Sequence, residues 1–170
     1  MHPARRQPDA ITLRELVPAD RPLLAAAFER LSPRSRYLRF LTPLPALPER
    51  TLDRLMDVDG REHVALAALD RGELVGVARY VRDRRDRGLA DVAVTVVDSH
   101  QGRGLGARLL AALLDHAGAH GLRALTFDVH PSNEAGRRLV RSLGARMAWS
   151  DGLLRGELPT PARPALRLAA

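Results

Sequence analysis

The sequence contains no cysteine and no lysine. Without cysteine the chain cannot form disulfides, thiolate metal sites or an acyl-cysteine intermediate. Without lysine it cannot build a Walker-type phosphate loop, in which a lysine contacts the phosphates. All 27 basic residues are therefore arginines, and Ile11 is the single isoleucine. This composition is typical of a GC-rich coding bias, which weakens the functional interpretation of any one arginine.

Aromatic residues make up only 4 % of the chain, which leaves few stacking platforms for single-stranded nucleic acid. The formal charge of +7 permits attraction to phosphates, but nucleic acid is not favoured as a partner. No apolar run approaches the ~18 residues of a membrane span, and the N-terminal segment lacks the apolar core of a signal peptide. We therefore expect a cytoplasmic protein without a membrane partner.

A chain of 170 residues fits one domain, and its hydrophobic periodicity predicts alternating strands and helices. We predict a domain over residues 10–158, with tails at 1–9 and 159–170. The expected strands are 11–17, 63–69, 73–81, 89–97, 123–129, 147–149 and 153–158. The expected helices are 18–31, 34–41, 49–57, 104–120 and 131–143. Because strand 89–97, a helix and strand 123–129 follow one another, those two strands should be parallel.

A glycine-rich turn joins the strand at 89–97 to the leucine-rich helix behind it. Gly102, Gly104 and Gly106 allow a tight turn whose amides point into one concavity, and the helix adds its own unpaired amides. This pattern predicts an anion cradle, with phosphate as the ligand. A plain connection is one alternative. A dinucleotide fingerprint over residues 102–107 is another, but residues 98–101 separate it from the strand and too little chain follows to complete that fold.

Two segments carry a resemblance to a known family. The turn QGRGLG at 101–106 resembles the Q/R-x-x-G-x-G/A signature of the GCN5-related N-acetyltransferase (GNAT) family. The segment NEAGRRLVRSLGA at 133–145 is similar to the second cofactor segment of that family, and residues 35–69 resemble bacterial Pat-type protein lysine acetyltransferases. The resemblance implies a single α/β (α+β) domain with a mixed central sheet, helices on both faces, and parallel strands splayed around an acetyl-CoA slot.

The same resemblance implies which residues bind acetyl-CoA. The backbone of Val94, Thr95 and Val96 would pair with the pantetheine arm, and the Val96 amide would polarise the thioester carbonyl. Asn133 would contact the cofactor arm, although a helix cap explains it equally well. The pyrophosphate loop would comprise Gln101, Gly102, Arg103, Gly104, Leu105, Gly106 and Ala107, with Arg103 and Arg108 near the outer phosphates.

The resemblance also implies a catalytic base at Asp91, ten residues before Gln101. A lysine-like amine has a pKa near ~10.4, so it must lose a proton before it attacks a thioester. Strand alternation places Asp91 on the face opposite the valines of its strand. A carboxylate at a strand end is the structural alternative. Other carboxylates kept as candidates are Glu62, Glu73, Asp98 and Asp128.

One position departs from the family pattern. Many members carry a tyrosine that protonates the departing thiolate, where this chain has Val140. A thiol pKa near ~8.5 would let the thiolate leave unprotonated.

Other patterns point to weaker hypotheses. Asp98, Ser99 and His100 contain the residue types of a hydrolase triad, but neighbours in sequence are not expected to form that relay. His116 and His120 have the spacing of a metal-binding pair, yet a solvated helix end is favoured and no metal is expected. The charged segment 82–88 is predicted to be a solvated hairpin tip.

The sequence therefore predicts an acetyl-CoA-dependent N-acetyltransferase that transfers the acetyl group directly to an amine, either a protein lysine or a small molecule. The alternative is a non-catalytic module that binds acyl-CoA or uses its arginines for interaction.

Overall fold

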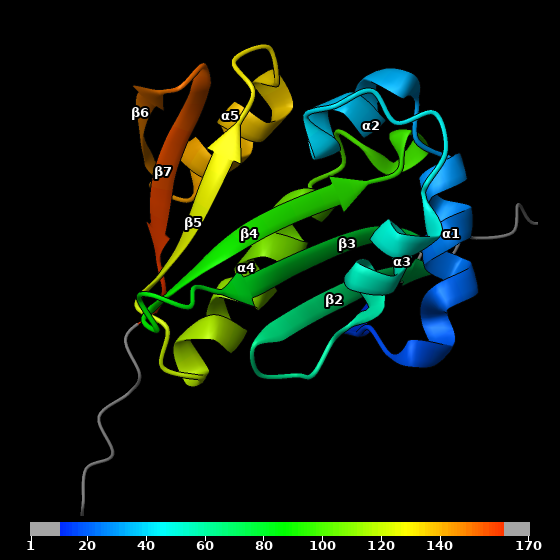
Figure 1. Ribbon diagram of the computed structural model, residues 1–170, viewed down its shortest axis with the longest axis horizontal. Helices are drawn as coiled ribbons and strands as arrows, with labels where there is room; N and C mark the ends of the chain where they lie inside the picture. Colours follow the sequence, from blue (N-terminus) through cyan, green and yellow to red (C-terminus); the bar gives the residue numbers. More distant parts are fainter. Residues whose placement is uncertain (1–10, 162–170) are drawn as a thin grey trace, which may run out of the picture.

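The computed structural model describes residues 11–161 and contains one seven-stranded mixed sheet in the order β1-β2-β3-β4-β5-β7-β6 (Figure 1). The strands are β1 (Thr12–Glu15), β2 (His63–Asp70), β3 (Glu73–Arg82), β4 (Leu89–Val96), β5 (Ala124–Val129), β6 (Arg146–Ser150) and β7 (Leu153–Pro159). The helices are α1 (Arg21–Glu29), α2 (Pro33–Phe40), α3 (Glu49–Met56), α4 (Leu105–Ala119) and α5 (Glu134–Ser142), with short 3-10 turns η1 (Pro18–Asp20) and η2 (Asp98–His100).

The expected elements are present, and their ends differ by a few residues. The helix expected at 18–31 is divided into η1 and α1, because the Asp20 carboxylate accepts hydrogen bonds from the Val17 amide (2.9 Å) and the Arg14 guanidinium (2.6 and 2.8 Å). At the other end β7 includes Pro159, and the Thr160 amide donates to the Arg123 carbonyl. The tail expected at 1–9 and residues 162–170 of the second tail lie outside the described residues.

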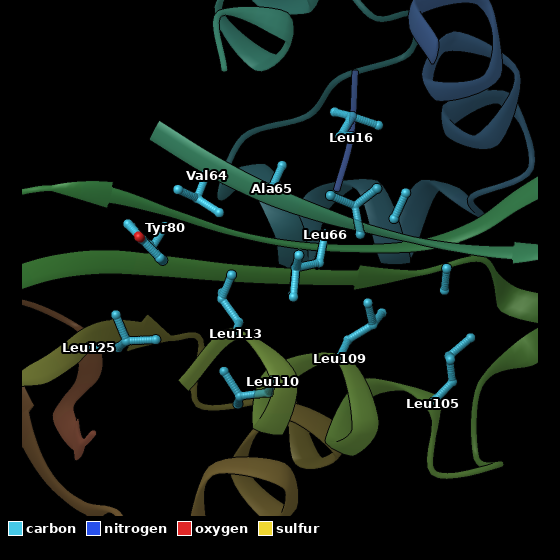
Figure 2. Close-up of a cluster of buried hydrophobic side chains, with 14 of the residues drawn as sticks. Leu16, Val64, Ala65, Leu66, Tyr80, Leu105, Leu109, Leu110, Leu113 and Leu125 are labelled. Carbon is cyan, nitrogen blue, oxygen red and sulfur yellow. The ribbon is translucent and has the colours of Figure 1, made fainter. Parts of the chain in front are cut away.

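Helices cover both faces of the sheet, as predicted (Figure 1). On one face Leu109 and Leu113 point from α4 toward β3 and are fully buried (Figure 2). The five leucines of this helix recur at helical spacing and are all buried, and each contributes about 1.5–3 kcal/mol by leaving water: Leu105, Leu109, Leu110, Leu113 and Leu114. Gly76 of β3 gives α4 room to approach, since a side chain there would collide with Leu109. Helices α1, α2 and α3 cover the opposite face.

Strands β4 and β5 are parallel, as predicted, but they pair only at their first residues. Leu89–Asp91 of β4 pairs with Ala124–Thr126 of β5. After Asp91 the two strands diverge, and β5 continues in antiparallel pairing with β7 (Figure 1). The sheet is therefore open on one side of β4 along Val92–Val96. This confirms the expected splay of the parallel strands.

The pairing of β4 with β3 fixes the direction of its side chains. Asp91 is opposite Val81, and Thr95 is opposite Val77. Thr95 lines a cavity together with residues of α1, whereas Val94 and Val96 lie near Gly106 of α4. Asp91 and Thr95 consequently share the face covered by α1–α3, and the valines share the α4 face, as strand alternation predicts.

The expectation of a solvated helix end at His116 is wrong. The His116 Nδ1 atom lies 3.1 Å from the hydroxyl of Tyr80, which is completely buried in β3. The His116 ring also stacks on His120 at 4.1 Å. A buried phenol needs a hydrogen-bond partner, so His116 is drawn inward, and burial lowers the pKa of its imidazole.

Segment 82–88 forms the tip of the β3–β4 hairpin, as predicted. Several of its charges pair within the chain: Arg87 bonds Glu62, and Asp86 accepts two hydrogen bonds from Arg123 at 2.7 and 2.6 Å. Among the described residues, no helix has both the length and the apolar character required to cross a bilayer.

Candidate active site

The glycine-rich turn opens α4 and forms a cradle. Gly102 and Gly104 have φ values of +71° and +76°, in the left-handed region that favours glycine. No atom lies within 4 Å of the position that a Cβ would occupy at either glycine. The first amide to bond within the helix is that of Arg108, to the Gly104 carbonyl at 3.1 Å. The amides of residues 105–107 therefore have no partner within α4, an arrangement that fits a diphosphate.

Three hydrogen bonds hold the segment that leads into this cradle. The Asp98 carboxylate accepts from the Ser32 amide at the start of α2 (3.1 Å). The Gln101 side-chain amide donates to the Val96 carbonyl (2.9 Å) and to the Ser35 hydroxyl (3.3 Å). Gln101 thus ties the turn to the end of β4 and to α2. These hydrogen bonds restrain the segment from within the protein, and a restrained loop loses less entropy on binding.

His100 provides a further anchor. Its Nδ1 atom lies 2.9 Å from the Ser99 hydroxyl, and its Nε2 atom lies 3.0 Å from the Asp70 carboxylate at the end of β2. Asp98, Ser99 and His100 do not form the three-residue relay among themselves, as expected, because Asp98 pairs with Ser32 and the carboxylate that contacts His100 is that of Asp70. These contacts tie the segment before the glycine turn to the end of β2.

We expect His100→Ala to raise the KM for acetyl-CoA by about three- to tenfold, because one hydrogen bond that holds the loop contributes about 1 kcal/mol. The kcat value should change little, since His100 does not reach the gap in the sheet. Ser99→Ala keeps the contact between His100 and Asp70 and should behave like the wild type. Steady-state kinetics of both variants checks this. Unchanged KM in His100→Ala would show that the loop holds its shape without this anchor.

The free side of β4 presents backbone groups to the gap. The Val97 amide donates to the Val75 carbonyl on β3, so the amide and carbonyl of Val96, and by alternation those of Val94, point away from β3. The Val96 carbonyl is taken by Gln101, whereas its amide faces the gap. Thr95 differs from its two neighbours, because its backbone faces β3 and its side chain lies on the α1–α3 face.

The gap is bounded on both faces. On one face Leu139 of α5 lies against Gly106 of α4. On the other, the Arg34 guanidinium of α2 donates to the Ser132 carbonyl between β5 and α5 (3.2 Å). Asn133 caps α5 by accepting from the Gly136 amide (2.9 Å), which leaves its NH₂ group as the donor for a ligand.

Two other predicted positions have different surroundings. Val140, at the position of the family tyrosine, is buried in α5. The Arg108 guanidinium donates to the Ile11 carbonyl (3.3 Å), so its side chain is engaged away from the cradle, whereas Arg103 is exposed.

Asp91 is the last β4 residue that pairs with β5, so it lies where the strands begin to diverge. Its carboxylate is reached by solvent and forms neither a hydrogen bond nor a salt bridge within residues 11–161. The surrounding protein raises the pKa of Asp91, first by desolvation and then by the charge of Asp128, while Arg39 opposes this shift. An unpaired carboxylate with a raised pKa suits a proton acceptor.

The other candidate carboxylates are engaged elsewhere. Glu62 pairs with Arg87, and Glu73 pairs with Arg30. Asp98 accepts from the Ser32 amide, and Asp128 pairs with Arg155.

A cavity lies on the same face of β4 as Asp91. Apolar side chains of α1, α2, α3 and β3, with Val97 just after β4, form most of its wall, and its polar lining comes from Arg39, Arg79 and Thr95. Sequence reasoning missed both arginines. A signal was present for Arg79, which interrupts the apolar run LVGVARYV of β3.

A mixed sheet that opens beside a glycine-rich helix start is the architecture of the GNAT fold. The chain belongs to the acetyltransferase (GNAT) family, whose model matches residues 25–145.

Known relatives agree with this assignment. Acetyltransferase PA5475 of Pseudomonas aeruginosa is 36 % identical over 138 residues, which cover 79 % of this chain and 74 % of that protein. Acetyltransferase Pat of Mycolicibacterium smegmatis is 32 % identical over 154 residues. These cover 83 % of this chain, which spans only 45 % of Pat. The solved GNAT domain of S. lividans PAT superposes with a TM-score of 0.84 at 28 % identity, covering 94 % of this chain and 99 % of that domain. The resemblance to Pat-type catalytic domains is thereby confirmed.

Proposed function

We propose that this protein is a cytoplasmic, acetyl-CoA-dependent N-acetyltransferase that transfers the acetyl group directly to an amine. The observation that carries the proposal is the divergence of β4 from β5 at Asp91, because an unpaired carboxylate lies where the open strand edge begins and a glycine-rich cradle follows the end of that strand. Two solved structures of the same fold contain acetyl-CoA, which supports it as the acyl donor.

The residues of this chain divide the binding between them. The amides of residues 102–107 would hold the pyrophosphate, and the backbone of Val94 and Val96 would pair with the pantetheine arm. Asn133 would donate to the same arm from the opposite side of the gap. Acetyl-CoA, once bound, supplies an acyl group activated as a thioester. The Val96 amide faces the gap and would polarise the thioester carbonyl.

The reaction needs a proton acceptor. The protonated amine first passes one proton to Asp91. The neutral nitrogen then forms a bond to the acyl carbon, the carbon–sulfur bond breaks, and the second proton that leaves the nitrogen passes to water. Aspartate is one methylene shorter than glutamate, which favours transfer through a water molecule. The coenzyme leaves as a thiolate, whose pKa near ~8.5 makes a dedicated acid at Val140 unnecessary.

The class of acceptor is the finer part of the proposal. Similarity to Pat-type domains supports a protein lysine, and a small amine is the second candidate. The charged side chains in the cavity on the Asp91 face of β4 bear on this choice.

A thiol-release assay with acetyl-CoA and a panel of amines and lysine peptides tests the proposed reaction. We expect free coenzyme A to appear only when an amine is present, with one acetylated product for each thiol released. A binding module would hold acetyl-CoA in calorimetry and release no thiol. A protein that instead bound nucleic acid would lose affinity steeply with salt and ignore coenzyme A.

A further inference from the structure

We propose that the acceptor is a small amine that also carries a carboxylate, and that Arg79 and Arg39 bind this carboxylate in the cavity on the face of β4 that Asp91 shares. This inference rests on the proposed acetyltransferase function and specifies its substrate class. It favours an apolar amino acid over a protein lysine.

The cavity lies between the sheet and helices α1–α3. Its wall includes Leu24, Phe28, Phe40, Leu55 and Val77, so most of its surface is apolar. Thr95 of β4 supplies a hydroxyl, and the two arginines supply the charge. Since Thr95 and Asp91 share one face of β4, a ligand in this cavity lies on the side of the sheet from which Asp91 accepts a proton.

Among residues 11–161 the hydrogen-bond partners of Arg79 are neutral. The residue is 6 % exposed, and its Nη1 atom donates to the Leu55 carbonyl (2.6 Å) and contacts His63 Nε2 (3.1 Å). A guanidinium has no acceptor, so His63 Nε2 must accept and the imidazole is neutral. Burial and the nearby Arg79 charge both lower the pKa of His63, in agreement with this assignment. No charge in these contacts offsets that of Arg79.

Arg39 adds a second positive charge. Its guanidinium lies over the Phe40 ring at 4.8 Å, and the described residues place no carboxylate in a salt bridge with Arg39 or Arg79. Burial lowers the pKa of both arginines, that of Arg79 to about 9, so Arg79 is protonated at neutral pH. The negative charge of Asp91 opposes this lowering of the Arg39 pKa. The charged side chains that line the cavity are both arginines, so its lining is positive.

Burying a cation without a counter-ion is unfavourable. A coding bias accounts for many surface arginines, but it does not account for an arginine held inside an apolar strand. A ligand carboxylate supplies the missing negative charge and matches the planar guanidinium geometry. A lysine side chain would bring a third cation into the same space. The charges thus favour an acceptor whose amine faces Asp91 and whose carboxylate faces Arg79.

The substrate test compares matched amines in the thiol-release assay. The probes are leucine, methionine and phenylalanine, the methyl ester and the decarboxylated amine of each, and a peptide with one lysine. We expect kcat/KM to fall at least about tenfold when the carboxylate is esterified or removed, the loss of roughly one charged hydrogen bond. Esterification lowers the basicity of the amine, whereas decarboxylation raises it. A fall of kcat/KM in both series is therefore due to the missing carboxylate and not to a change in amine basicity.

The residue test uses Arg79→Met and Arg39→Met, with Arg84→Met as the matched control on the exposed hairpin tip. Arg79→Met should bring the acid and its ester to similar kcat/KM values, mainly through the KM for the acid. The KM for acetyl-CoA should not change. Arg79→Lys should restore part of the preference, and Arg84→Met should retain all of it. Calorimetric binding of N-acetylleucine supplies a readout that does not depend on turnover.

Each outcome decides the inference. The inference is overturned if acids and esters are used equally, or if the lysine peptide is preferred. It is also overturned if every amino acid is rejected while another amine is accepted, or if Arg79→Met keeps the preference for the acid. If Arg79→Met does not fold, Arg39→Met and Arg79→Lys decide instead. Acetyl-CoA binding is measured first in calorimetry. If acetyl-CoA does not bind, the proposed acetyltransferase function is rejected. If it binds but the acceptor preferences differ from those expected, only the acceptor class is wrong.

Discussion

Replacing Asp91 by asparagine is expected to slow thiol release from acetyl-CoA by about 10²- to 10⁴-fold, the usual contribution of a general base. Asparagine keeps the size and polarity of the side chain but cannot accept the proton that the amine loses. Because Asp91 lies on the face of β4 opposite Val94 and Val96, acetyl-CoA affinity should remain that of the wild type. Thiol release and calorimetry with acetyl-CoA measure the two effects separately.

The thermal stability of this variant supplies the first control. Burial raises the pKa of Asp91 in the folded protein above its usual value of 3.8. The stability contribution of such a group is most favourable below that usual value, and it is lost as the pH rises through the higher pKa of the folded state. At neutral pH Asp91→Asn should therefore melt no lower than the wild type, so the loss of activity cannot be attributed to unfolding.

The pH profile supplies the second control. Asp128→Asn removes a negative charge that raises the pKa of Asp91, so the acidic limb of kcat/KM should move to lower pH while the neutral rate stays near that of the wild type. Full activity of Asp91→Asn would assign the base to another residue.

The second large effect is expected at the cradle. Gly104→Ala should weaken acetyl-CoA binding by about tenfold or more, since it places a methyl group in the open concavity and strains a left-handed residue by about 1–2 kcal/mol. That strain is enough to shift the adjacent amides from the positions that fit a diphosphate. Calorimetric titration with acetyl-CoA and with coenzyme A measures the loss.

Gly121→Ala is the matched control. Gly121 lies just beyond the other end of α4, has a φ of +79°, and has the same open surroundings as Gly104. Both variants should lose similar unfolding free energy, but Gly121→Ala should bind acetyl-CoA normally. Equal affinity in the two variants would mean that the glycine turn does not contact the phosphates.

Sequence reasoning identified the features that depend on neighbouring residues. Alternation in β4 gave the opposite faces of Asp91 and Val94, and the leucine spacing gave the buried side of α4. The glycine turn was recognisable because left-handed backbone positions and a helix start lie within a few residues. The divergence of β4 and β5 came from the family resemblance, since no local pattern states where two strands stop pairing.

The sequence alone does not predict the features that are built from distant segments of the chain. The cavity combines Arg39 of α2 with Arg79 of β3, and neither position has a periodic pattern that marks it as charged and buried. The loop anchor joins His100 to Asp70, which lies thirty residues earlier in the sequence. His116 was expected in solvent because its partner, the Tyr80 hydroxyl, becomes visible only when β3 and α4 are packed. In each case tertiary contacts decide the environment of the side chain.

The short ladder between β4 and β5 has a thermodynamic consequence. An interior strand that stops pairing after Asp91 gives up hydrogen bonds that a continuous sheet would form within itself. An extended ligand that lies along Val92–Val96 would form these hydrogen bonds instead. A ligand that binds in this gap should therefore raise the free energy of unfolding of the domain.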